Sequence, residues 1–150
     1  IKAEWKAKVK NDNRPFTAFM PVTNGVLMQT GCVMVLSRWD GQQKFIDEMN
    51  ATGIKVKNVL ILDKEIHGMG DLKHSFESRY ESIIFSSEKE FLFNGKRPQD
   101  IIKFRRVLPS ELKHPNEKPV GLLEWLISKC TKQHGTVFDP FMGSGYTAVA

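Results

Sequence analysis

Four stretches of the chain carry the apolar patterns of β-strands. Residues Cys32 to Leu36 form a continuous apolar run of strand length, which is typical of a buried parallel strand. From Ile54 to Leu62, alternating lysines give way to a fully apolar run, and Arg79 to Ser86 is apolar at its centre. A shorter apolar run covers Thr136 to Phe138. We expect a strand at each of these four places.

Three other stretches have the spacing of amphipathic helices, with apolar residues three or four positions apart. The first runs from Phe16 to Met28, although Pro21 should kink or end it. The second follows Asp40, whose side chain can cap it. The third covers Leu122 to Thr131 and is started by Pro119.

The order of these elements indicates the fold class. Strand, helix and strand follow one another between residues 32 and 62, which implies a parallel crossover. Phe93-Asn94-Gly95 indicates a hairpin after the third strand. A chain of 150 residues with 41% hydrophobic content can build one core, so we expect a single domain over residues 1–150. The predicted class is α/β, with a doubly wound sheet.

Composition indicates which partners and which cellular compartment suit such a domain. The net charge of +5 and the pI of about 9.3 favour an acidic partner. Cys32 and Cys130 stand apart in the sequence, which is typical of two buried reduced thiols in an intracellular protein. No apolar run approaches the ~18 residues that span a bilayer, and no signal peptide is recognisable.

The most informative stretch follows the last predicted strand. Asp139-Pro140-Phe141 leads into Gly143-Ser144-Gly145 and then into residues that can open a helix. In α/β proteins this order places a small ligand at the carboxyl end of a strand. Glycines let the backbone approach the ligand closely, and the first amides of a helix are free to bind it. Because a carboxylate stands beside these amides, a ligand with charges of both signs would suit the turn.

Three other glycine motifs can be compared with this turn. A P-loop needs Gly-x-x-x-x-Gly-Lys-Ser/Thr, which does not occur in the sequence. The nucleophile elbow Gly-x-Ser-x-Gly fails because Met142 stands in place of its first glycine. The dinucleotide fingerprint Gly-x-Gly-x-x-Ala does fit Gly143, Gly145 and Ala148. A dinucleotide site has no use for the Asp-Pro-Phe prefix, yet it stays open as an alternative.

Asp139 to Gly145 resembles the S-adenosylmethionine (SAM) binding motif of the DNA amino-methyltransferases, which methylate adenine N6 or cytosine N4. His114 to Pro119 is similar to the segment before this motif in the permuted group of that family, where the catalytic motif precedes the SAM motif. The resemblance is close over residues 114–150. It implies a Rossmann-like SAM methyltransferase sheet that is mostly parallel with one antiparallel strand, and Tyr80 to Phe85 is similar to that strand.

This resemblance implies SAM as the cofactor and assigns its binding residues. Asp139 would face the ammonium of the methionine moiety, whereas Asn116 and Lys118 would approach its carboxylate. Phe141 would line the pocket, and Thr147 would contact the methionine end. The full set is Asn116, Lys118, Asp139, Pro140, Phe141, Gly143, Ser144, Gly145 and Thr147. Tyr146 stands where the family most often has threonine.

The resemblance also implies double-stranded DNA as the partner, with the target base extracted from the duplex. A cluster of basic side chains is available for phosphate contacts. It consists of Lys96, Arg97, Lys103, Arg105, Arg106 and Lys113. As in the rest of the family, a cytoplasmic protein encoded by a bacterium or a phage is expected.

No catalytic residue is assigned. The family holds the target amine with an (Asp/Asn/Ser)-Pro-Pro-(aromatic) motif, and the sequence contains no Pro-Pro pair. In the permuted order this motif would precede Ile1, so we expect a fragment that is incomplete at both ends and inactive alone. Methylation of cytosine C5 is excluded because neither cysteine follows a proline. No histidine has metal-ligand spacing with a cysteine. A non-catalytic DNA-binding paralogue of the same fold remains the second alternative.

Overall fold

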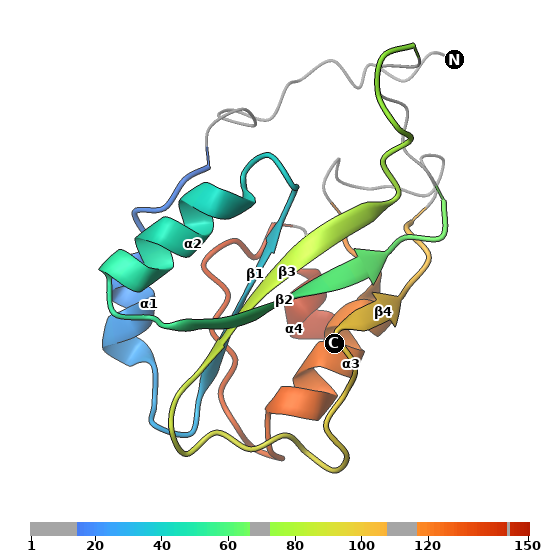
Figure 1. Ribbon diagram of the computed structural model, residues 1–150. Coiled ribbons are helices and arrows are strands. Elements are labelled where there is room, and N and C mark those ends of the chain that lie inside the picture. Colours follow the sequence, from blue (N-terminus) through green and yellow to red (C-terminus); the bar gives the residue numbers. More distant parts are fainter. Residues whose placement is uncertain (1–14, 67–72, 108–116, 144) are drawn as a thin grey trace.

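The structure is a computed structural model that describes residues 15–66, 73–107, 117–143 and 145–150 (Figure 1). Its centre is an open four-stranded sheet with the strand order β1-β3-β2-β4. The strands are β1 (Cys32–Ser37), β2 (Val56–Asp63), β3 (Tyr80–Ser87) and β4 (Ile101–Lys103). The helices are α1 (Met20–Val26), α2 (Gln42–Ala51), α3 (Val120–Cys130) and α4 (Tyr146–Val149).

One strand of the sheet runs against the others. β3 pairs antiparallel with β1 and with β2, whereas β2 and β4 pair in parallel. β1, β2 and β4 therefore share one direction, which confirms the expected sheet with a single antiparallel strand. The crossover from β1 through α2 to β2 is parallel, but β3 lies between the two strands. Ser37, Asp63 and Lys103 thus end their strands on the same side, which we call the carboxyl end of the sheet.

Helices cover both faces of the sheet, as a doubly wound fold requires (Figure 1). On one face, Met20 of α1 and Met49 of α2 pack against Ile84 in a cluster with β1. On the other face, the leucines of α3 pack against Ile83 and Phe85. Successive residues of a strand point to opposite faces, so the apolar centre of β3 supplies both cores. Ile83 and Ile84 have no exposed surface.

Several local expectations are wrong. The segment 136–138 forms no strand, and Val137 and Phe138 are about half exposed, because neither β1 nor β4 pairs with it. No hairpin follows Phe93, since the next strand, β4, runs parallel to β2 instead of returning along β3. Three-residue β4 was itself not expected from the sequence.

The helix starts also differ from the expectation. Pro21 lies in the first turn of α1 rather than breaking it, and this position suits a residue without an N–H donor. Asp40 does not cap α2, because its carboxylate binds the guanidinium of Arg38 at 2.7 Å.

The two cysteines lie together. Cys32 in β1 and Cys130 at the end of α3 make a thiol–thiol hydrogen bond, and both are half-buried. This contact and the burial raise the pKa of the Cys130 thiol, so it keeps its proton at neutral pH. Both cysteines are free but only half-buried rather than buried, and no local pattern in the sequence places them in contact.

Replacement of Ile84 tests whether β3 supplies the buried centre. Ile84→Ala should lower the free energy of unfolding by about 2–5 kcal/mol, because it leaves a cavity between the sheet and α1 and α2. Ile101→Ala in β4 is the control, since Ile101 is 60% exposed, and should cost about 1 kcal/mol or less. Urea denaturation followed by circular dichroism measures both. Equal losses would contradict the described core.

Candidate functional site

The segment from Asp139 to Gly145, which we call the glycine turn, is stabilised by both carboxylate oxygens of Asp139. One carboxylate oxygen accepts a hydrogen bond from the backbone N–H of Phe141 at 2.8 Å, which is an Asx turn. The other oxygen accepts a hydrogen bond from the Thr147 hydroxyl at 2.6 Å. Each carboxylate oxygen has two lone pairs, so Asp139 can still accept bonds from a ligand. In this structure, Asp139 links the start of the turn to α4 through its hydrogen bond with Thr147.

The two glycines of the turn have backbone conformations that other residues avoid. Gly143 has φ +51° and Gly145 has φ +82°, both in the left-handed region. The amide of Gly145 donates to the carbonyl of Met142 at 2.7 Å, so it is used within the turn and is not bare. Apart from the chain neighbours of Gly145, no atom of the described residues lies within 4 Å of where its Cβ would be. The turn is therefore open above Gly145, with room for a ligand.

An aromatic contact holds the outer side of the turn. The ring of Phe141 meets the ring of Phe19 edge to face at a centroid distance of 4.8 Å, and that of Phe16 at 6.1 Å. Such pairs contribute about 0.5–1.5 kcal/mol beyond the area they bury. Phe141 nevertheless remains 56% exposed. Its ring is therefore accessible to a ligand, while Phe19 fixes its orientation.

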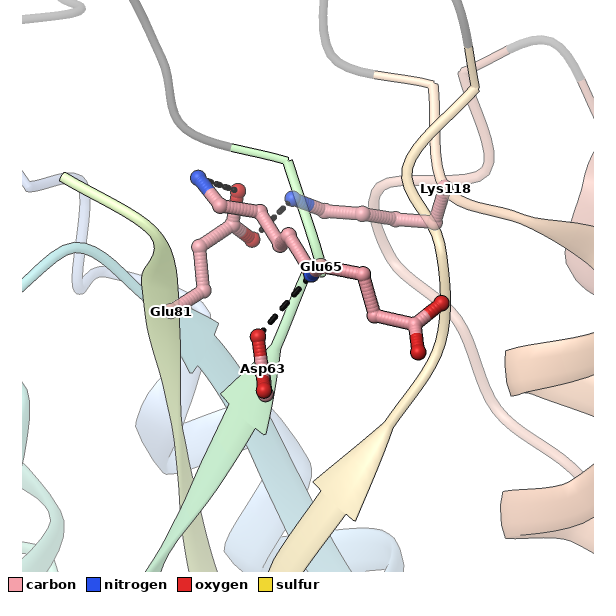
Figure 2. A network of polar contacts seen from close by, with 5 residues as sticks. Asp63, Glu65, Glu81 and Lys118 are labelled. Carbon is pink, nitrogen blue, oxygen red and sulfur yellow. Dashed lines mark hydrogen bonds and ion pairs between the residues drawn. The ribbon is translucent and has the colours of Figure 1, made fainter.

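Lys118 lies at the carboxyl end of the sheet, in an ion cluster with Glu81 and Lys64 (Figure 2). Its ammonium binds one carboxylate oxygen of Glu81, and the ammonium of Lys64 is 3.5 Å from the other. Burial raises the pKa of Glu81, but the two lysines outweigh burial and hold the pKa below its usual range. Glu81 is therefore ionised at neutral pH, and the cluster carries one surplus positive charge.

The glycine turn and the Lys118 segment are neighbours. Glu117 makes a hydrogen bond with the hydroxyl of Tyr146, the residue directly after Gly145. This bond and the nearby negative charge raise the pKa of Tyr146, so the phenol stays neutral. α3, which begins two residues after Lys118, also contacts α4. The structure thus brings together the two segments that the sequence motifs connect.

Sequence analysis missed Glu81, Lys64 and Phe19. Glu81 had a recognisable feature, because it is a single acid within an apolar strand and a charge at such a position needs a partner. The partner Lys118 lies 37 positions away along the chain, and no local pattern joins the two.

A second ion pair joins the last residue of β2 to the residue before β3. Asp63 receives two hydrogen bonds from Arg79, at 2.6 and 2.8 Å. It receives a third from the backbone N–H of Glu65 at 2.9 Å (Figure 2). The bidentate Arg79 contact, aided by the Glu65 amide, lowers the pKa of Asp63 from 3.8 to about 2. This pair fixes the start of β3 and hence the position of Glu81.

The basic residues fall into two groups. Lys103 ends β4 at the carboxyl end of the sheet, and Arg105 and Arg106 follow it. There the amide of Arg106 donates to the carbonyl of Lys64 at 3.3 Å. Lys96 and Arg97 are exposed in the connection before β4. That connection meets the far end of α3, since the amide of Asn94 donates to the carbonyl of Lys129 at 2.8 Å. Only the first group lies at the carboxyl end of the sheet.

Asn116, Ser144 and Lys113 lie outside the described residues. A separate small apolar cavity of about 50 Å³ opens under α3. Its walls include Leu60, Phe85, Phe93 and Trp125, and none of them belongs to the glycine turn. Cofactor pockets typically exceed about 300 Å³, so this cavity is too small.

Two further searches concern only the described residues. Among them, no three histidine, cysteine or acidic side chains gather where a metal ion could bind. No described helix is long and apolar enough to cross a membrane.

Comparison with known proteins identifies the class. The family model described as DNA methylase matches residues 16–150, and the chain belongs to this family. The type II methyltransferase M2.LlaDCHI of Lactococcus lactis subsp. cremoris is 41% identical over 64 residues, which cover 41% of this chain and 23% of that protein. M2.MboI of Moraxella bovis is 47% identical over 38 residues, covering 25% of this chain and 14% of that protein. The matches thus span less than a quarter of these relatives.

A solved structure has the same fold. The crystal structure of an M1.HpyAVI–SAM complex superposes with a TM-score of 0.71 and covers 91% of this chain and 71% of that one. At 22% sequence identity this likeness establishes the α/β fold.

The Asp63–Arg79 pair makes a specific prediction about pH. Because the folded state lowers the pKa of Asp63 to about 2, the pair stabilises the fold above about pH 4 and the stabilisation is lost as the pH falls through 2. Arg79→Gln should return this pKa towards 3.8. Carbon NMR of the Asp63 carboxyl at pH 3 should then find it mostly ionised in the wild type and mostly neutral in the variant. Arg38→Gln, which breaks a different pair, should leave Asp63 unchanged, and an equal response to both variants would refute the assignment.

Proposed function

We propose that this chain is the cofactor-binding part of a SAM-dependent DNA amino-methyltransferase, which methylates N6 of adenine or N4 of cytosine. The observation that carries the proposal is the open glycine turn, shaped by Asp139 and joined to the Lys118 segment through Tyr146 and Glu117. Membership of the DNA methylase family supports the same conclusion. We also propose that residues 1–150 form one domain.

The residues of the turn fit the chemistry of SAM. The amino-acid end of SAM carries a carboxylate and an ammonium, and when bound SAM supplies the methyl group. Asp139 would accept from the ammonium with its remaining lone pairs, and Lys118 would donate to the carboxylate. The left-handed glycines keep side chains away from the space that the ligand needs. Phe141 would offer its exposed ring to the apolar part of the ligand.

The remaining assigned residues have supporting roles. Thr147 holds Asp139 in place through its hydroxyl, and Pro140 restricts the backbone between Asp139 and Phe141. Asn116 and Ser144 are proposed to join the site from the loop before Lys118 and from the turn itself.

Double-stranded DNA is the proposed substrate. Lys103, Arg105 and Arg106 lie at the same end of the sheet as Lys118, so they can contact phosphates while a target base reaches the cofactor. Lys113 is proposed to join them. Lys96 and Arg97 lie beyond the three-residue β4 and near the far end of α3, which at about 1.5 Å per residue is about 16 Å long. Their contacts with DNA would be peripheral.

Calorimetry with SAM and with NAD on the complete protein decides between the proposed enzyme and a dinucleotide enzyme. We expect saturable binding of SAM and none of NAD, because the Asp139 carboxylate suits an ammonium and opposes a pyrophosphate. Binding of NAD in preference to SAM would overturn the proposal.

A paralogue without catalytic activity would transfer no labelled methyl group to DNA even as the complete protein. The 150 residues alone should transfer none in either case, since they contain no Pro-Pro pair.

Replacement of Gly145 tests the role of the turn itself. Gly145→Ala forces a Cβ into a left-handed conformation, at a cost of about 1–2 kcal/mol, and should weaken SAM binding about fivefold or more as the turn relaxes away from that conformation. Gly25→Ala in α1 is the matched control, because that glycine has open space around it and helical geometry. It should stabilise α1 without changing SAM affinity. Unchanged affinity in both variants would contradict a binding role of the turn.

A further inference from the structure

The ion cluster of Lys64, Glu81 and Lys118 holds two cations around one buried carboxylate (Figure 2). The three side chains come from three separate segments: the end of β2, the start of β3 and the residue before Pro119. Glu81 and Lys64 are largely buried, with 19% and 16% of their side-chain surface exposed. Lys118 is the most accessible member at 30%. A single carboxylate thus neutralises only one of two lysines.

The ammonium of Lys118 has more donors than its contact among the described residues uses. It has three N–H donors, and Glu81 occupies one of them. A carboxylate ligand could accept a second without breaking the contact with Glu81. Glu81 removes most of the freedom of a long lysine side chain, so the entropy of ordering Lys118 is already lost before a ligand arrives.

The chain connects Lys118 to the glycine turn through the residue before it. The preceding residue, Glu117, binds Tyr146, which follows Gly145 directly. The side chain of Lys118 is therefore held by Glu81 of the sheet, while the residue before it is bonded to the residue after Gly145. The Asp63–Arg79 pair fixes the same end of β3 but contacts neither Lys118 nor the turn in the described structure.

We propose that Glu81 is a positioning residue that holds the Lys118 ammonium beside the glycine turn and thereby makes the site select ligands that carry a carboxylate. This inference rests on the proposed SAM site and adds the origin of its selectivity. Glu81 itself does not touch the ligand. A purely structural ion pair, the alternative, would stabilise the fold without distinguishing between ligands.

Decarboxylated SAM separates the two roles, because it keeps the adenosine, the sulfonium and the ammonium and lacks only the carboxylate. The experiment measures the dissociation constants of SAM and of decarboxylated SAM for the complete protein and its variants. Glu81→Gln should weaken SAM binding about tenfold, the size of one charge-assisted hydrogen bond. The affinity for decarboxylated SAM should change less than about twofold, since that ligand makes no bond with Lys118.

Two further variants keep the test decisive. Arg38→Gln breaks an exposed ion pair outside the cluster and should leave the ratio of the two affinities as in the wild type. Glu81→Asp keeps the charge but withdraws it by one methylene, and should cause an intermediate loss for SAM alone. It replaces Glu81→Gln if that variant does not fold.

The outcomes distinguish this inference from the proposed function. If the wild type binds neither ligand, the proposed function fails and the inference with it. If the wild type binds SAM but the Glu81 variants leave the ratio unchanged, Glu81 has only a structural role and the proposed function stands. A loss confined to SAM supports the positioning role.

Discussion

The site depends on the placement of one strand between two others. β3 pairs on both sides, and its successive isoleucines fill the cores on both faces of the sheet. Because it runs against its neighbours, it begins where β1 and β2 end. Glu81, the second residue of β3, is therefore delivered to the carboxyl end of the sheet, where Lys64 and Lys118 meet it. The same packing that stabilises the fold therefore sets the position of the Lys118 ammonium.

The glycine turn is organised by shorter-range forces. The carboxylate of Asp139 accepts hydrogen bonds from the Phe141 amide and the Thr147 hydroxyl, so the backbone turns between these residues. Gly145 ends the turn in a left-handed conformation that is strained for residues with a side chain. Phe19 then holds Phe141 from the α1 side, while Glu117 holds Tyr146 from the α3 side. The turn is thereby supported from both layers of helices and remains open between them.

Local patterns in the sequence predicted β1, β2, β3, α2 and α3, because each has an apolar periodicity that its burial requires. They failed for residues 136–138, which have strand composition but find no pairing partner in the described structure. The residues of the glycine turn could be predicted because the turn is one contiguous motif. Glu81 and the Cys32–Cys130 contact could not, because each joins segments that only the folded sheet brings together. The amide of Gly145, expected to be bare, is used inside the turn for a reason that only its dihedral angles reveal.

Mapping SAM on the protein by amide chemical-shift changes tests the central claim most directly. The claim is that the glycine turn and the Lys118 segment form one binding site at the carboxyl end of the sheet. Saturating SAM should shift the amides of Gly143, Gly145, Thr147 and Lys118, and leave those around the small cavity under α3 in place. Shifts confined to that cavity, at Phe93 and Trp125, with an unperturbed turn, would contradict it.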